Sequence, residues 1–215
     1  MKKFAIVLSG CGVFDGSEIH EATLTMLAVA QNNAEYVLFA PDVEQHHVIN
    51  HITGKEMKEI RNVLVESARI ARGDIKSLAE FDAAEFDYLI FPGGFGAAKN
   101  LSSFAFDGSN AKVLPEVDNA IKAMLKAEKP IGALCISPAV IAKVIGDGVN
   151  VTIGNDVGTA EAIQTANGVH VVADHGEVVV DKKHKVYTTP CYMLDANIEQ
   201  IYQGATNIVK AMLKA

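Results

Sequence analysis

Cys135 carries the strongest chemical signal in the chain, because a buried strand is expected to end there and a helix to begin. Residues 130–134 form a short apolar run, and a helical pattern follows from Cys135 with almost no loop. Amides at a helix N-terminus stabilise anions, and a sharp strand-to-helix turn exposes a nucleophile above a sheet. The position therefore favours a reactive Cys135 thiolate. A buried structural thiol is the alternative interpretation.

A glycine-rich segment, PGGFG at residues 92–96, follows the apolar run 87–91. Glycines after a strand let the backbone approach a ligand and present unobstructed N–H groups. The amides of Gly93, Gly94 and Ile136 could together hold the oxygen of a tetrahedral adduct on the Cys135 sulfur. Taken alone, a Gly-Gly pair after a strand is typical of a plain turn, so this interpretation depends on the nearby cysteine.

Two glutamates, Glu18 and Glu21, stand one turn apart at the start of an expected helix over 16–32. A carboxyl in a half-dry cleft beside a thiolate has a raised pKa and can transfer protons near neutral pH. Asp15 precedes Glu18 with the spacing of a capping box, so Glu18 is expected to cap the helix and to have at most an accessory role in the site. Glu21 is therefore the better candidate for proton transfer. A solvated glutamate that complements the helix dipole is the alternative.

The pattern of apolar segments predicts an α/β fold in one domain spanning residues 1–215. Short continuous apolar runs indicate strands buried on both faces, which is typical of a mostly parallel sheet between two layers of helices. The expected strands are 4–8, 35–40, 87–91 and 130–134, followed by short β runs at 149–153, 169–173, 177–181 and 185–189. The expected helices are 16–32, 57–71, 116–128 and 195–213. Ligands of such doubly wound sheets bind beyond the carboxyl ends of the strands.

The composition excludes several classes of protein. The 215 residues carry a formal net charge of −7, which leaves no basic face for a nucleic acid. No apolar run reaches the roughly 18 residues of a membrane span. Three cysteines, an odd number, suggest free thiols in a reducing compartment, so a cytoplasmic location is expected. Cys11 and Cys191 are expected at strand ends, where either could act as a resolving thiol or be unrelated to Cys135.

Two further patterns fall short of a cofactor site. The G-x-G-x-x-D run at 10–15 resembles a dinucleotide fingerprint, but Asp15 replaces its third glycine and would repel a pyrophosphate. His46, His47 and His51 include an i,i+4 pair without the glutamate of a His-Glu-x-x-His zinc motif, so a solvated polar insertion is favoured. We expect no nicotinamide cofactor and no metal.

Three segments together resemble a known family. They are SGCGVFDGSEIHE at 9–21, FPGGFGAAKNL at 91–101 and IGALCISPA at 131–139. Their order and sequence are similar to the ElbB glyoxalase family, also called isoprenoid biosynthesis protein with amidotransferase-like domain. This family belongs to the PfpI-type, class I glutamine amidotransferase-like superfamily. The likeness extends over essentially the whole chain.

The resemblance implies a flavodoxin-like domain, a homodimer and a cofactor-free glyoxalase. In the family pattern the nucleophile falls on Cys135 and the acidic residue on Glu21. The implied reaction converts glyoxal to glycolate, or methylglyoxal to lactate, and some members are described as removing early glycation adducts from proteins. The substrate would thus be a small dicarbonyl.

Two other functions remain open at this stage. Hydrolases of the superfamily often carry a histidine directly after the nucleophile, and here that residue is Ile136. A cysteine hydrolase or amidotransferase subunit would need His170 or His175 as its base, although a turn is the favoured interpretation of the segment around His175. The third alternative is a non-enzymatic, redox-sensing dimer whose Cys135 thiol is oxidised.

Overall fold

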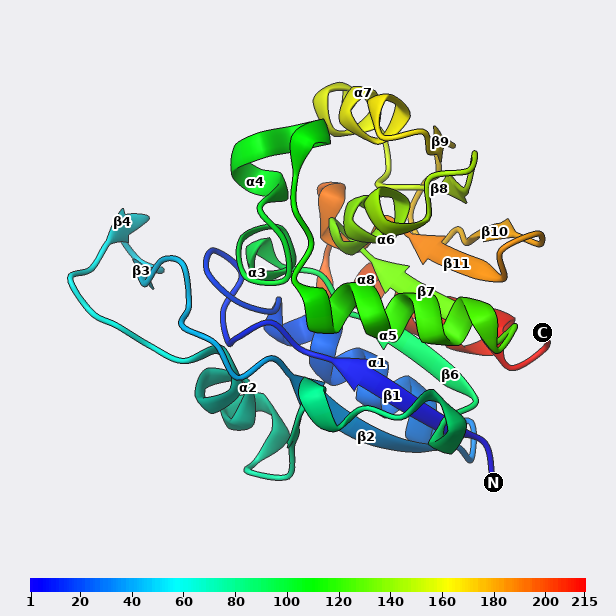
Figure 1. Cartoon of the computed structure of the whole chain (residues 1–215), viewed down its shortest axis with the longest axis horizontal. Coiled ribbons are helices and arrows are strands. Elements are labelled where there is room, and N and C mark those ends of the chain that lie inside the picture. Colours follow the sequence, from blue (N-terminus) through cyan, green and yellow to red (C-terminus); the bar gives the residue numbers. More distant parts are fainter.

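A seven-stranded sheet forms the centre of the computed structural model, which describes all residues 1–215 (Figure 1). Its strand order is β10-β11-β7-β6-β1-β2-β5, and every neighbouring pair is parallel except β10 with β11. The strands are β1 (Lys3–Val7), β2 (Glu35–Ala40), β5 (Lys76–Ser77), β6 (Tyr88–Phe91), β7 (Ile131–Leu134), β10 (Val179–Asp181) and β11 (Val186–Thr189). The expected mostly parallel, flavodoxin-like α/β fold is confirmed.

Helices cover both faces of the sheet (Figure 1). They are α1 (Ile19–Gln31), α2 (Val63–Ala71), α3 (Phe95–Lys99), α4 (Phe104–Asp107), α5 (Pro115–Lys126), α6 (Ser137–Ile145), α7 (Val157–Thr165) and α8 (Ile198–Met212). Side chains of β1 alternate between the layers: Phe4 and Ile6 pack with α1, α2 and α8, whereas Ala5 and Val7 pack with α3, α5 and α6. Burial on both faces explains the continuous apolar runs of the central strands.

Helix α1 begins later than the capping-box spacing predicts. Glu18 is itself the N-cap, and its side chain accepts a hydrogen bond from the Glu21 amide at 2.7 Å. The Asp15 carboxylate instead accepts from the Ile49 amide at 2.6 Å. The expected Asp15–Glu18 capping box is therefore wrong, because a contact with a distant loop takes the Asp15 side chain.

The structure also differs from the sequence prediction outside the central strands. The helix expected over 57–71 begins only at Val63, capped by Asn62, and residues 42–62 form a protruding arm with the short strands β3 (Ile49–Asn50) and β4 (Lys55–Glu56) (Figure 1). The runs at 149–153 and 169–173 shrink to β8 (Asn150–Val151) and β9 (Val169–His170), which pair as a separate parallel sheet. Helix α7 was not expected because it buries only Ile163 and so shows no apolar stripe.

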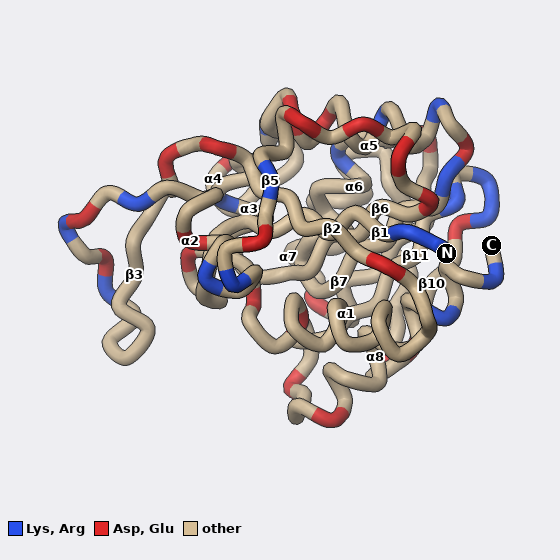
Figure 2. Tube along the Cα trace, turned by 90° about the horizontal axis from the view of Figure 1, so that it is seen from below, with Lys and Arg blue, Asp and Glu red and all other residues tan.

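Charged residues of both signs lie along the outer segments of the chain, while the central strands are almost free of them (Figure 2). None of the helices combines the length and the apolar character that a membrane crossing requires.

Candidate active site

The site lies where four neighbouring parallel strands end, in the order β11, β7, β6 and β1. The loops that follow them are tied together by hydrogen bonds. The Glu18 amide donates to the Gly93 carbonyl at 2.9 Å, and the Ser137 hydroxyl donates to the Pro92 carbonyl at 2.8 Å. The loops after β1, β6 and β7 therefore form one rigid rim at the carboxyl edge of the sheet, the expected place for a ligand.

Cys135 occupies a strained turn between β7 and α6. Its φ is +59°, a left-handed conformation that a non-glycine residue adopts only when the surroundings impose it. Its amide donates to the Thr189 carbonyl of β11 at 3.0 Å, which anchors the turn to the next strand. This is the predicted strand-to-helix elbow. The residue is only 7% exposed, so the sulfur sits inside the rim.

Glu21 is fully buried, and its carboxyl lies beside the Cys135 thiol, because the main chain at Gly93 is in close contact with both Glu21 Oε2 and Cys135 Sγ. Both carboxyl oxygens also accept hydrogen bonds from main-chain amides. The Gly93 amide donates to Oε2 at 2.8 Å, and the Tyr192 amide donates to Oε1 at 3.1 Å. The alternative of a solvated glutamate at a helix start is therefore wrong, because three loops enclose this carboxyl.

The three amides expected to form an oxyanion hole have different partners in the structure. The Gly94 and Ile136 amides lie near enough to Cys135 to lower the pKa of its thiol. The Gly93 amide is engaged by Glu21. It is therefore not available for the predicted oxyanion hole, which leaves the Gly94 and Ile136 amides as its candidate donors.

Gly93 allows sulfur, carboxyl and main chain to meet. A Cβ built on it would lie 2.5 Å from Glu21 Oε2 and 2.9 Å from Cys135 Sγ, and it would also overlap Cys135 Cβ. We expect Gly93→Ala to separate the two side chains and to lower the free energy of unfolding by about 1–3 kcal/mol. Thermal unfolding and the alkylation rate of Cys135 would measure both effects. Gly158→Ala is the matched control, because a Cβ there meets only an oxygen 3.8 Å away, and equal behaviour of the two variants would contradict this prediction.

Burial controls the ionisation of the pair. It raises the pKa of Cys135 well above the ordinary thiol value, and the Glu21 charge adds to the rise, while the Gly94 and Ile136 amides oppose it. The expectation of a Cys135 thiolate stabilised by a helix N-terminus is therefore wrong in direction. Burial also raises the pKa of Glu21 from 4.5 to about 8, with a second contribution from Glu18. Because two buried negative charges in contact repel, the pair holds at most one near neutral pH.

The raised pKa of Glu21 makes stability depend on pH. The folded state binds this proton more tightly than the unfolded state, so the contribution of Glu21 is fully present below pH 4.5 and is lost as the pH rises to about 8. We expect the free energy of unfolding to fall across that window by up to about 1.4 kcal/mol per pH unit. Denaturant titrations of wild type and Glu21→Gln at several pH values would test this. Parallel curves for the two proteins would refute it.

Two neighbours of Glu21 have roles that differ from the sequence interpretation. Glu18 is 8% exposed and acts on Glu21 through its charge and through the helix cap. Tyr192 was not predicted at all, because its contact with Glu21 uses a backbone amide and joins residues 171 positions apart. Only its place directly after an expected strand end, beside Cys191, could have drawn attention to it.

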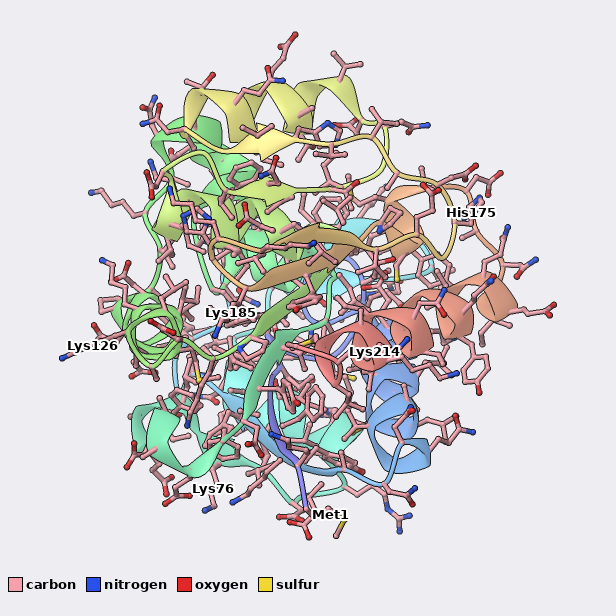
Figure 3. All side chains as sticks on the ribbon, turned by 90° about the vertical axis from the view of Figure 1, so that its right-hand side faces the viewer. Met1, Lys76, Lys126, His175, Lys185 and Lys214 are labelled. Carbon is pink, nitrogen blue, oxygen red and sulfur yellow. The ribbon has the colours of Figure 1, made fainter.

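The histidines of the alternative mechanisms lie elsewhere. No hydrogen bond joins His170 or His175 to Cys135. His175 sits at the outer edge of the molecule beside Asp174 (Figure 3). His46 and His47 pack edge to face against each other, and both rings contact Phe106. No group of three His, Cys, Asp or Glu side chains is arranged to hold a metal. A Cys–His dyad is thus not formed in this structure.

The other two cysteines, Cys11 and Cys191, are free, as Cys135 is. Cys11 is partly exposed in the loop after β1, and Cys191 is buried in the turn after β11, directly before Tyr192. The structure therefore shows no disulfide with Cys135.

Comparison with known proteins shows the family to which the chain belongs. No protein-family model matches the chain. The chain is 49% identical to "ES1 protein homolog, mitochondrial" from Rattus norvegicus over 99% of its own length and 83% of the relative's. The chain belongs to the ES1 family. It is also 48% identical to the human "Glutamine amidotransferase-like class 1 domain-containing protein 3, mitochondrial", over 99% of this chain and 82% of that one.

Solved structures support the same assignment for this ES1-family chain. The crystal structure of an isoprenoid biosynthesis protein with amidotransferase-like domain from Ehrlichia chaffeensis has a TM-score of 0.91 and 40% identity, with 99% of each chain covered. The resemblance stated from the three sequence segments is thereby confirmed. Glyoxalase III from Candida albicans has a TM-score of 0.64 and 14% identity over 100% of this chain and 97% of that one, which shows a shared fold.

The expected cytoplasmic location is contradicted by these relatives. Proteins 48–49% identical over nearly the whole chain are named mitochondrial in rat and human. The cysteine argument was too coarse, because an odd number of free thiols separates reducing from oxidising compartments and does not separate one reducing compartment from another.

Proposed function

We propose that the chain is a cofactor-independent glyoxalase that converts glyoxal to glycolate through a covalent adduct on Cys135. The observation that carries the proposal is the buried Glu21 carboxyl beside the Cys135 thiol, with the Gly93 main chain in close contact with both. A base with a pKa of about 8 in contact with a nucleophile is matched to proton transfer near neutral pH.

The first step is capture of one aldehyde. Glu21, as the carboxylate, takes the proton of the Cys135 thiol while the sulfur forms a bond to the aldehyde carbon. The carbonyl oxygen becomes an oxyanion, which the Gly94 and Ile136 amides stabilise. The proton then passes from Glu21 to that oxygen and leaves a hemithioacetal beside the second, unreacted aldehyde. The raised thiol pKa is compatible with this step, because the thiol loses its proton during the attack and not before it.

The second step moves hydrogen between the two carbons. Glu21 removes the C–H proton of the hemithioacetal carbon, and the electron pair forms a carbon–carbon double bond while the neighbouring aldehyde oxygen becomes an enediolate oxygen. Glu21 returns that proton to the neighbouring carbon, and the hydroxyl proton of the first carbon passes to the enediolate oxygen, which gives a thioester of glycolate on Cys135. The first carbon is thus oxidised and the second reduced, so no external oxidant or reductant is needed. Water then hydrolyses the thioester to glycolate and the free thiol.

The geometry favours a small substrate. Cys135 is 7% exposed, and Gly93 leaves no room even for a methyl group on its side of the sulfur. This supports glyoxal over methylglyoxal and over adducts attached to a protein. The names of the close relatives state no reaction, and glyoxalase III is similar in fold alone, so the proposal depends on the Cys135–Glu21 contact.

The test is formation of glycolate from glyoxal, followed by proton NMR with purified protein and no added cofactor. Product formation must be measured, because glyoxal also disappears by reacting with lysine and arginine side chains, of which the chain has 19. A glutaminase assay on the same sample examines the amidotransferase alternative. Glyoxal loss without glycolate, or glutamine hydrolysis that depends on His170 or His175, would overturn the proposal.

A further inference from the structure

The turn after β11 is attached to helix α1 twice through one residue, Tyr192. Its amide points inward and donates to Glu21 Oε1 at 3.1 Å. Its phenol oxygen lies 2.8 Å from His20 Nδ1, on the residue next to Glu21 along the chain. The two aromatic rings are 5.9 Å apart at their centres. The inward and outward contacts thus hold the same turn against the same end of α1.

This turn is built in a strained conformation. Cys191, directly before Tyr192, has a φ of +43° and is buried, in the short 3-10 helix Cys191–Met193. A non-glycine residue in this region costs free energy that the surrounding contacts must offset. The Tyr192–His20 hydrogen bond is one such contact, and it is made at the surface, where His20 is exposed.

We propose that the Tyr192–His20 contact is a latch, and that Tyr192 is a positioning residue that holds the Glu21 carboxyl against the Cys135 sulfur. The Gly93 amide fixes one carboxyl oxygen from the loop after β6, and the Tyr192 amide fixes the other from the loop after β11. Without the second donor the carboxyl is free to rotate away from the sulfur. The latch's role in turnover rests on the proposed function, whereas its effect on Cys135 does not.

The latch has a defined effect on the protonation of Glu21. Glu18 and Cys135 face this carboxyl from α1 and from the elbow, and Cys191 and Tyr192 face it from the turn. Burial and the Glu18 charge raise the pKa of Glu21, while the Tyr192 and Gly93 amides lower it by stabilising the carboxylate. Loosening the turn therefore raises that pKa further. The active form, with Glu21 as the base, then appears at higher pH.

The experiment compares Tyr192→Phe with Tyr202→Phe. Tyr202 donates a similar hydrogen bond, at 2.9 Å, to Gln31 at the other end of α1, so its loss controls for a general loosening of the helix. Each protein is assayed for glycolate formation against pH and for the alkylation rate of Cys135 by iodoacetamide against pH. For Tyr192→Phe we expect the midpoint of the first rise with pH to move up by about 0.5–1 unit, with kcat at pH 7 reduced about 3–10-fold and KM little changed. Tyr202→Phe should superimpose on wild type.

His20→Ala removes the same hydrogen bond from the side of its exposed partner. It therefore tests the contact independently if Tyr192→Phe folds poorly. It should shift the midpoint by the same amount, and the double variant should shift it no further, because both changes act through one contact. An unshifted profile for Tyr192→Phe, or an equal shift for Tyr202→Phe, would overturn the latch. If wild type forms no glycolate but the alkylation midpoint still moves, the proposed function fails and the latch stands.

Discussion

Cys135→Ser should reduce glycolate formation by about 10³-fold or more, to a rate close to that of glyoxal in buffer. A serine hydroxyl holds its proton far more tightly than a thiol, so the Glu21 carboxylate cannot activate it at neutral pH. The Gly94 and Ile136 amides would still be present, but no adduct would form for them to stabilise. The substitution is nearly isosteric, so the free energy of unfolding should change little.

The measurement is glycolate by NMR, with intact-protein mass spectrometry to detect the adduct on the protein. Cys11→Ser is the matched control, because Cys11 is a free, partly exposed thiol in the neighbouring loop with no contact to Glu21 in the structure. It should keep wild-type turnover. Turnover of Cys135→Ser within about ten-fold of wild type would show that covalent capture is not part of the reaction.

Glu21→Gln should lower turnover by about 10²–10⁴-fold while adduct formation on Cys135 stays measurable. An amide cannot accept the C–H proton, so the enediol step fails. Capture is slowed but stays measurable, because removing the Glu21 charge removes one cause of the raised pKa of Cys135. The amide NH₂ must also face either the Gly93 or the Tyr192 amide, both of which are donors. That mismatch should cost about 1–3 kcal/mol of the free energy of unfolding.

Glu199→Gln is the control for this variant. Glu199 stands in the first turn of α8, as Glu21 does in α1, but its side chain is exposed. A helix-dipole effect would appear in both variants, whereas a proton-transfer effect appears only in Glu21→Gln. Equal turnover by wild type and Glu21→Gln would remove Glu21 from the mechanism and with it the proposed route.

The pKa of Cys135 separates the enzymatic interpretation from the redox-sensing alternative. A sensor thiol reacts as a preformed thiolate, whereas burial raises the pKa of Cys135 well above the ordinary thiol value. A nucleophile that loses its proton to Glu21 during attack does not need a preformed thiolate, so the raised pKa counts against the sensor alone. The structure therefore supports the base-assisted mechanism over oxidation of a low-pKa thiol.

Several features of the site could be predicted from local sequence. Cys135 follows a short apolar run and precedes a helical one, and the glycines at 93 and 94 follow another strand. Parallel strands end at one edge of a sheet, so residues just after them are expected to be neighbours. The same reasoning extends to Glu21, because α1 starts beyond the end of β1. It does not extend to Tyr192, whose side chain type is irrelevant to the amide that contacts Glu21.

The chain's order of apolar segments was enough to determine the doubly wound architecture and to bring Cys135, Gly93 and Glu21 to one edge, since each of these depends on residues close together in sequence. Only the tertiary structure decided the direction of the pKa shifts of Cys135 and Glu21, and which of the Gly93, Gly94 and Ile136 amides contacts which side chain. Burial of Cys135 and Glu21, and the engagement of the Gly93 amide by Glu21, arise from the packing of four loops that are remote in sequence. Desolvation depends on all the atoms around a group, so a thiol expected to be ionised by its helix is instead held protonated by its surroundings.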